Sequence, residues 1–118
     1  MAEKQPHLTY QERNGVTVVE FADRKILDEL CIHEIQSELD DIVEGVRGIR
    51  LLLSFKNVEH LSSAALGVLI RLNKRVAEQG GTLKLSDISP PIYEVFKITR
   101  LNKLFDIHET ADEALAAF

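Results

Sequence analysis

One stretch of the chain decides its fold, and it covers residues 49–69: IRLLLSFKNVEHLSSAALGVL. Its first part, Ile49–Phe55, is a nearly continuous apolar run, which is typical of a strand buried on both faces of a sheet. Apolar residues then recur at helical spacing from Ser63 to Gln79, where Gly80-Gly81 ends the pattern. A buried strand followed by an amphipathic helix predicts an α/β domain.

A hairpin and another helix precede this stretch. Residues 8–13 predict an edge strand, Asn14-Gly15 predicts a tight turn because both residues accept positive φ, and Val16–Phe21 predicts a β-branched strand. Residues 28–46 predict a helix, because apolar residues recur there every three or four positions. Its acidic residues predict a solvated face. The expected buried stripe is Leu27, Cys31, Ile35, Leu39, Ile42 and Val46.

Shorter elements complete the chain. Thr82–Leu85 predicts a strand, Ser89-Pro90-Pro91 opens a helix, Ile107-His108 predicts a last strand, and Thr110 is the expected N-cap of a terminal helix. Strands and helices that alternate in this way indicate one domain with a largely parallel sheet. We expect its core to include Ile35, Leu39, Leu51, Leu53, Leu69 and Val76.

The composition is that of a globular protein. The chain has 118 residues, of which 45% are hydrophobic and 28% charged. No apolar run approaches the roughly 20 residues that span a bilayer, and the polar N-terminus does not resemble a signal peptide. We therefore expect a cytoplasmic domain over residues 8–118, preceded by a flexible segment at 1–7, with no membrane insertion.

Charge is unevenly distributed along the chain. The formal net charge is −5, but residues 62–105 carry seven Lys and Arg against three Asp and Glu. This positive excess is modest and is interrupted by acids, so it favours a protein partner over nucleic acid.

Groups that carry chemistry are scarce. The four histidines, His7, His33, His60 and His108, show no paired spacing typical of a metal site. Cys31 lies on the predicted apolar stripe and is expected to be a small buried side chain. No glycine-rich phosphate loop opens a helix, and Ser62-Ser63 lacks the glycines of a nucleophile elbow. We expect no enzymatic activity, no metal and no cofactor.

The residues between the buried strand and the following helix allow two interpretations. Either Ser62 or Ser63 caps the helix, as a hydroxyl commonly does at this position. Alternatively, one of the two hydroxyls is a modification site, because a phosphate at a helix N-terminus is stabilised by the dipole and by free N–H groups.

Five stretches follow one another along the chain: Leu27-Asp28, Ser62-Ser63-Ala64-Ala65-Leu66-Gly67-Val68-Leu69, Gly80-Gly81-Thr82-Leu83, Ser89-Pro90 and Leu101-Asn102-Lys103-Leu104-Phe105. In this order they resemble the STAS domain family, and within it the bacterial anti-sigma factor antagonists. The resemblance covers residues 8–117.

The resemblance implies a fold and a function. The fold is a mixed sheet of four to five strands with about four helices packed mainly on one face. The implied function is to bind an anti-sigma factor of serine-kinase type, and so to release a sigma factor. The kinase would phosphorylate Ser63, with Ser62 as the alternative, and a serine phosphatase would reverse this. The expected partner-binding residues are Ser62, Ser63, Ala64, Leu66, Arg71 and Lys74.

The chain departs from the family pattern at this site. Ser62 stands where the family has Asp, Ala64 where it has a second hydroxyl residue, and Ala65 where it has Gly. These departures support a second hypothesis, in which the domain is a non-phosphorylated accessory or scaffold subunit of a signalling assembly or a lipid transporter. A third, a nucleotide-binding or small-ligand domain, has the least support, because no acid is placed to hold a ribose.

Overall fold

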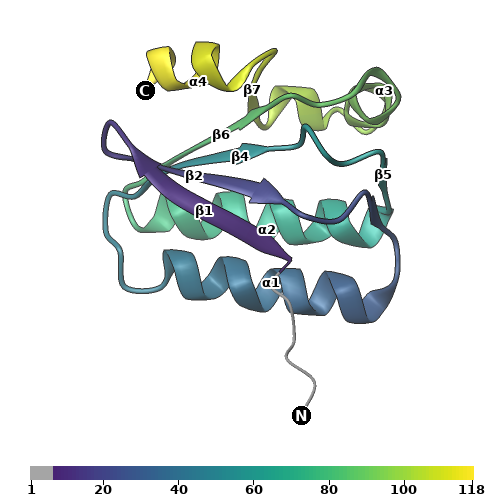
Figure 1. Cartoon of the computed structure of the whole chain (residues 1–118), viewed down its shortest axis with the longest axis horizontal. Helices are drawn as coiled ribbons and strands as arrows, with labels where there is room; N and C mark the ends of the chain where they lie inside the picture. The colour runs from purple at the N-terminus through teal and green to yellow at the C-terminus, as the bar shows by residue number, and fades with distance from the viewer. Residues whose placement is uncertain (1–6) are drawn as a thin grey trace.

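The computed structural model describes residues 7–118, and it shows a sheet covered by helices on both faces (Figure 1). The strands are β1 (Leu8–Arg13), β2 (Val16–Phe21), β3 (Lys25–Ile26), β4 (Arg50–Ser54), β5 (His60–Leu61), β6 (Thr82–Ser86) and β7 (Asp106–His108). The helices are α1 (Glu29–Val43), α2 (Ser63–Glu78), α3 (Pro90–Ile98) and α4 (Ala111–Ala117), with a 3-10 turn η1 (Leu101–Lys103).

The sheet is mixed, as the resemblance implied. Within residues 7–118 the strand order is β1-β2-β4-β6-β7, and β3 pairs separately with β5. Only β1 runs antiparallel, against β2, through the hairpin turn at Asn14 and Gly15, whose φ values are 54° and 80°. The other pairs are parallel. β4 lies at the centre with Leu51, Leu52 and Leu53 fully buried, which confirms the predicted buried strand.

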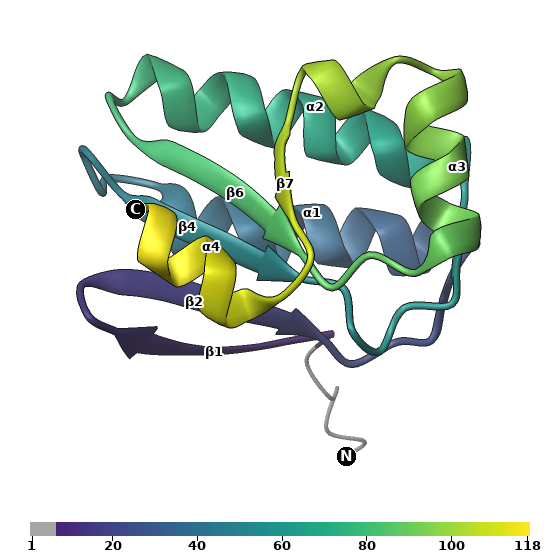
Figure 2. The ribbon, with the colours of Figure 1, turned by 90° about the horizontal axis from the view of Figure 1, so that it is seen from above.

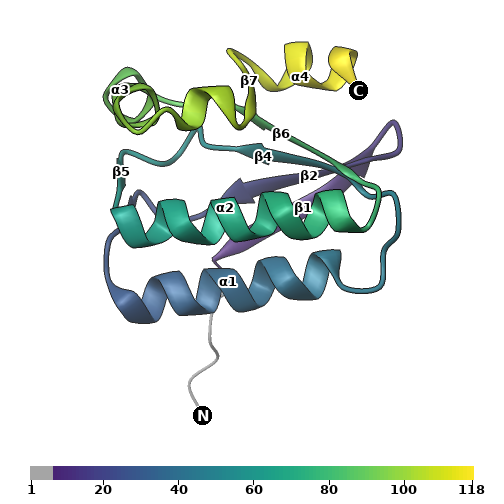
Figure 3. The ribbon, with the colours of Figure 1, turned by 180° about the vertical axis from the view of Figure 1, so that it is seen from behind.

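The main core lies between the sheet and the pair α1 and α2, which run side by side on one face (Figure 3). All six predicted core residues are buried there: Ile35, Leu39, Leu51, Leu53, Leu69 and Val76. α4 lies on the opposite face of the sheet (Figure 2), where Ala114 packs against Val16, Val18 and Leu52. α3 follows the carboxyl end of β6 and contributes Ile92 and Phe96 to the main core.

α1 is shorter than predicted at both ends. Asp28 caps its start by accepting a hydrogen bond from the backbone N of Cys31 at 3.1 Å. The helix ends at Val43, because Gly45 adopts a φ of 76°. Two residues of the predicted stripe therefore lie outside the helix and are exposed, Leu27 at 52% and Val46 at 43%. Ile32 and Val43 take buried positions instead.

A flexible segment was predicted at residues 1–7, and residues 1–6 of it lie outside the described residues. His7 is held in place by backbone hydrogen bonds. Its carbonyl oxygen accepts from the N of Ala22 at 2.7 Å, and its own N donates to the Glu38 carboxylate at 3.0 Å. Among the described residues, none of the helices combines the length and the apolar character needed to cross a membrane.

Candidate functional site

The start of α2 is fixed by the short β3–β5 pair. Ile26 and Leu61 are partners in that pair, and the N of Ser62 donates to the carbonyl oxygen of Ile26 at 3.0 Å. Ser62 has extended backbone angles, φ −84° and ψ 165°, and its hydroxyl accepts from the N of Ala65 at 3.3 Å. Ser62 is therefore the N-cap of α2, which confirms that a hydroxyl of this stretch caps the helix.

The first turn of α2 presents small side chains to solvent. Ser63 and Ala64 are exposed, and the first turn contains no acidic residue. The backbone N–H groups of a first turn have no partner within the helix, and the helix dipole is positive here. A hydroxyl at Ser63 is thus accessible at a place that favours a negative charge.

Leu66, predicted to contact a partner, lies in the core instead. Its exposed fraction is 5%, and it packs in the main core together with Ala65 and Val68. The reason is helical geometry: Leu66 faces the sheet, on the same side of α2 as Leu69. Leu66 therefore stabilises the domain, and its side chain presents almost no area to a partner.

Arg71 and Lys74, the other predicted contact residues, are exposed further along α2. The Arg71 guanidinium donates to the Oε1 of Gln36 at 3.0 Å, so it bridges α2 to α1. Arg75 forms an ion pair with Asp40 at 3.2 Å. A groove between the two helices is lined by these side chains together with Val68. Arg71 and Arg75 therefore border this groove.

Two exposed leucines lie just before α1 and in its first turn, and their exposure was missed in the sequence. Leu27 is 52% exposed and Leu30 is 67% exposed. The parallel register of β3 and β5 places Leu27 beside Ser62, since Ile26 pairs with Leu61. Leu27 therefore adds exposed apolar area beside the accessible start of α2. The periodic pattern could not reveal Leu27, because it fits the buried stripe in spacing.

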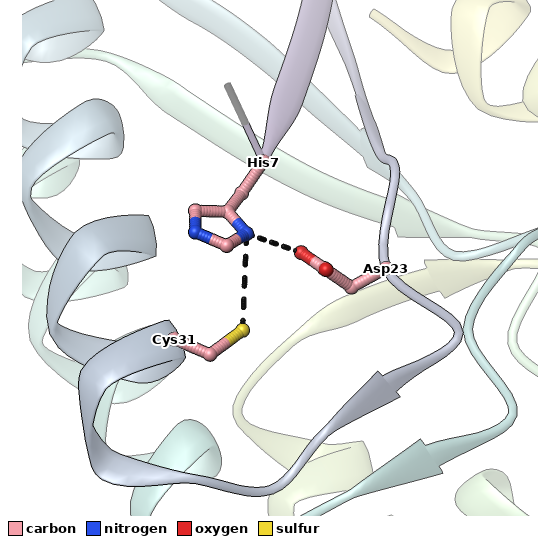
Figure 4. A group of neighbouring side chains, drawn as sticks. All are labelled: His7, Asp23 and Cys31. Atoms are coloured by element: carbon pink, nitrogen blue, oxygen red, sulfur yellow. Dashed lines mark hydrogen bonds and ion pairs between the residues drawn. The ribbon is translucent and has the colours of Figure 1, made fainter. Parts of the chain in front are cut away.

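A second cluster was also missed. His7 is not isolated: its Nδ1 lies 2.6 Å from a carboxylate oxygen of Asp23 and 3.8 Å from the Sγ of Cys31, as Figure 4 shows. Its Nε2 lies 3.2 Å from the Oε1 of Glu34. The acidic residues of α1 were predicted to lie on a solvated face, but Glu34 and Glu38 contact His7 instead.

Cys31 is half-buried at the edge of the core, and not fully buried as predicted. Burial raises the pKa of its thiol to about 11, with further increases from the negative charges of Asp23, Asp28 and Glu38. The thiol is therefore protonated at neutral pH, and the field around it is negative.

Comparison with known proteins agrees with this fold. The sequence model of the STAS domain matches residues 7–114. An anti-sigma F factor antagonist of Paenibacillus polymyxa is 24% identical over 105 residues, which cover 89% of this chain and 88% of the relative. The anti-sigma-B factor antagonist of Bacillus subtilis (strain 168) is 38% identical over 61 residues, or 52% of this chain and 56% of the relative.

A solved structure is similar over nearly the whole chain. It is that of an anti-sigma-factor antagonist (STAS) domain protein from Planctomyces limnophilus, which superimposes with a TM-score of 0.85 at 26% identity. The match covers 97% of this chain and 98% of that chain. With its five-stranded mixed sheet and its family match over residues 7–114, the chain belongs to the STAS domain family.

Proposed function

We propose that this protein is an anti-sigma factor antagonist that works by binding and not by catalysis. In this proposal it binds an anti-sigma factor of serine-kinase type in the bacterial cytoplasm, and the bound partner releases its sigma factor. The names of the relatives support the function. The exposed hydroxyl of Ser63 at the start of α2, beside a neighbouring serine already engaged as the cap, is the observation that carries the proposed switch.

The contact surface that we propose centres on the start of α2. Ser62, Ser63 and Ala64 supply small side chains that allow close approach of a partner. Leu27 supplies apolar area beside them, and burial of such area is the main favourable term in protein association. Arg71 and Lys74 extend the surface along the helix and would face acidic groups of the partner.

Phosphorylation at Ser63 would end the complex. A phosphoserine adds about −1.5 to −2 charges. The helix dipole tolerates that charge, so the free protein stays folded. In the contact surface, however, the same dianion would lose its hydration without a counter-charge, which costs far more than a typical contact contributes. A serine phosphatase would then restore the binding form.

Ser63 is a better phosphate acceptor than Ser62 for a structural reason. The Ser62 hydroxyl accepts from the N of Ala65, and the residue is half-buried between β5 and α2. A phosphate on Ser62 would displace the cap, which is worth about 1 kcal/mol. Ser63 has no such role in the cap and is exposed.

Reconstitution with the purified serine-kinase anti-sigma factor of the same bacterium tests the proposal. We expect one phosphate, located by peptide mapping to Ser63, and no incorporation in Ser63→Ala. Ser37→Ala, a change at an exposed serine in the middle of α1, is the matched control and should be phosphorylated normally. The unphosphorylated protein and Ser63→Ala should bind the partner, whereas Ser63→Asp should bind it weakly.

Two results would contradict parts of this function. Phosphate lost in Ser62→Ala but retained in Ser63→Ala would move the site by one residue. Absence of phosphate on the protein isolated from its own cells, together with no binding to the kinase, would favour the accessory or scaffold subunit. The departures at Ser62, Ala64 and Ala65 from the family pattern are the observation behind that alternative.

A further inference from the structure

Three side chains with metal-ligating atoms converge near the N-terminal edge of the described chain. His7 precedes β1, Asp23 follows β2, and Cys31 lies in the first turn of α1 (Figure 4). Their ligating atoms all lie within 4.8 Å of one another, and all three residues are half-buried. The residues come from three separate elements, so the fold itself brings them together.

The backbone around the cluster is held by hydrogen bonds that do not use the ligating atoms. Glu38 accepts from the backbone N of His7 and of Leu8 at 3.0–3.1 Å, and thereby ties the segment to α1. On its other side, the His7 carbonyl oxygen accepts from Ala22. Asp28 caps the turn that carries Cys31. Ligands held in this way lose little freedom when they bind an ion.

Glu34 contacts the nitrogen of His7 that does not face Asp23 and Cys31. Its Oε1 lies 3.2 Å from the Nε2 of His7, so a proton on Nε2 is donated to a carboxylate whose side chain is only 13% exposed. In the metal-free chain the 2.6 Å contact between Nδ1 and Asp23 holds a shared proton, and once that proton leaves, the Nδ1 lone pair points toward Asp23 and Cys31. A histidine that gives its second N–H to a carboxylate is the usual arrangement of a metal-binding histidine.

The interatomic distances suit a small tetrahedral ion. Zinc lies about 2.0–2.3 Å from N, O and S ligands, so neighbouring ligand atoms are about 3.3–3.6 Å apart. To reach this spacing, the Nδ1–Sγ distance of 3.8 Å needs to shorten by only a few tenths of an ångström. The distance of 2.6 Å between Nδ1 and the Asp23 carboxylate oxygen needs to lengthen by less than about 1 Å.

We propose that His7, Asp23 and Cys31 form a zinc site, with Glu34 as the residue that orients His7. Imidazole, carboxylate and thiolate ligands together favour zinc, since hard cations reject the thiolate and Cu(I) has little affinity for the carboxylate. The ion would take the place of the proton shared by His7 and Asp23, and the Cys31 thiol would release its proton to solvent. Since the ligands are half-buried, the fourth position is open to water.

The negative charge around the cluster is consistent with this assignment. Asp23, Asp28, Glu34 and Glu38 all lie on the elements that surround it, and a dication offsets their mutual repulsion. The proposal does not depend on the antagonist function, because none of its residues belongs to the surface around Ser63.

Titration of the tag-free, reduced, full-length chain with zinc chloride and with cobalt chloride tests the site. We expect one equivalent of zinc by calorimetry. We also expect Co²⁺ to give a thiolate-to-cobalt charge-transfer absorption band that one equivalent of zinc removes. Cys31 is the one cysteine of the chain, so the band reports on this residue alone.

Variants locate the site. Cys31→Ser should abolish the cobalt band, and His7→Gln and Asp23→Asn should each lower zinc affinity at least tenfold. Glu34→Gln should lower the affinity about 10-fold and keep the thiolate band, as expected of a positioning residue. His60→Gln changes an exposed histidine and should have no effect.

Circular dichroism of each metal-free variant checks its fold. The cobalt spectrum of the unchanged chain decides the question even if a variant does not fold. Absence of stoichiometric zinc binding, lack of a thiolate band, or unchanged zinc affinity in Cys31→Ser would each overturn the proposal. Loss of zinc binding in His60→Gln would overturn it too.

Discussion

Ser62 and Ser63 are adjacent, yet their replacement by alanine should affect stability differently. Ser62→Ala removes a hydroxyl that accepts from the N of Ala65, while Ser63→Ala changes an exposed residue in the first turn. Comparison of these two variants separates the structural role of the stretch from its proposed signalling role. If capping resides in Ser62 alone, then Ser63 can be modified at no cost to the fold.

The expected magnitudes follow from the geometry at the start of α2. Loss of an N-cap serine costs about 1 kcal/mol, within a range of roughly 0.5–2. For a domain of this size that corresponds to a fall in melting temperature of about 3–6 °C. Ser63→Ala should change the free energy of unfolding by less than about 0.5 kcal/mol. Ser63→Asp should raise it by about 0.3–1 kcal/mol, because a carboxylate in the first turn interacts favourably with the dipole.

Urea unfolding followed by circular dichroism measures these differences, with unchanged m-values as the check that all variants unfold alike. Ser37→Ala serves as the control for serine-to-alanine replacement at an exposed helical position. Equal losses in Ser62→Ala and Ser63→Ala would refute the assignment of Ser62 as the sole cap. A destabilised Ser63→Asp would refute the argument that α2 tolerates a phosphate.

Four further predictions concern the fold. Leu69 is 3% exposed, so Leu69→Ala should cost about 2–5 kcal/mol in urea unfolding. Gly80→Ala should cost about 1 kcal/mol through its φ of 74° alone. Gly81→Ala should cost about 2–3 kcal/mol, because its Cβ would lie 2.5 Å from a backbone carbonyl oxygen. Lys84 holds the pKa of Asp106 below its usual range, so the pair stabilises the domain above about pH 4 and loses this effect as the pH falls further. Asp106→Asn should therefore lower the melting temperature at pH 7, and the difference from the unchanged protein should shrink on acidification.

Local patterns predicted the elements of the sheet well. The apolar run around Leu51–Leu53 predicted a central strand because the side chains of such a strand are buried on both faces, and Leu51 to Ser54 of β4 are all buried, whereas Arg50 at its start is exposed. Asn14-Gly15 predicted the hairpin because the turn requires positive φ at both positions. Thr110 was predicted as a cap, and its hydroxyl accepts from the N of Glu113 at 3.1 Å. Each of these signals lies within a few residues of the feature that it predicts.

Predictions that required packing partners were less accurate. Leu27 has the right spacing for the buried stripe of α1, but it precedes the N-cap residue Asp28 and therefore lies outside the helix. Leu66 was predicted as a contact residue together with the neighbouring serines, yet its side chain is buried against the sheet. Periodicity gives the spacing of a face but not which elements cover it, so the ends of α1 and the exposure of Leu66 were predicted wrongly.

The His7 cluster shows the same limit more sharply. His7 lies 16 residues from Asp23 and 24 from Cys31, as the contacts between them record. A spacing test for metal ligands detects pairs on one helix or one turn, such as residues three or four apart. Here the ligands meet only because β1 runs antiparallel to β2 and thereby brings the start of one strand to the end of the other, where the chain turns toward α1. The site is thus a consequence of topology, and isolated chemistry-bearing residues should be judged by the strand ends they occupy as well as by their spacing.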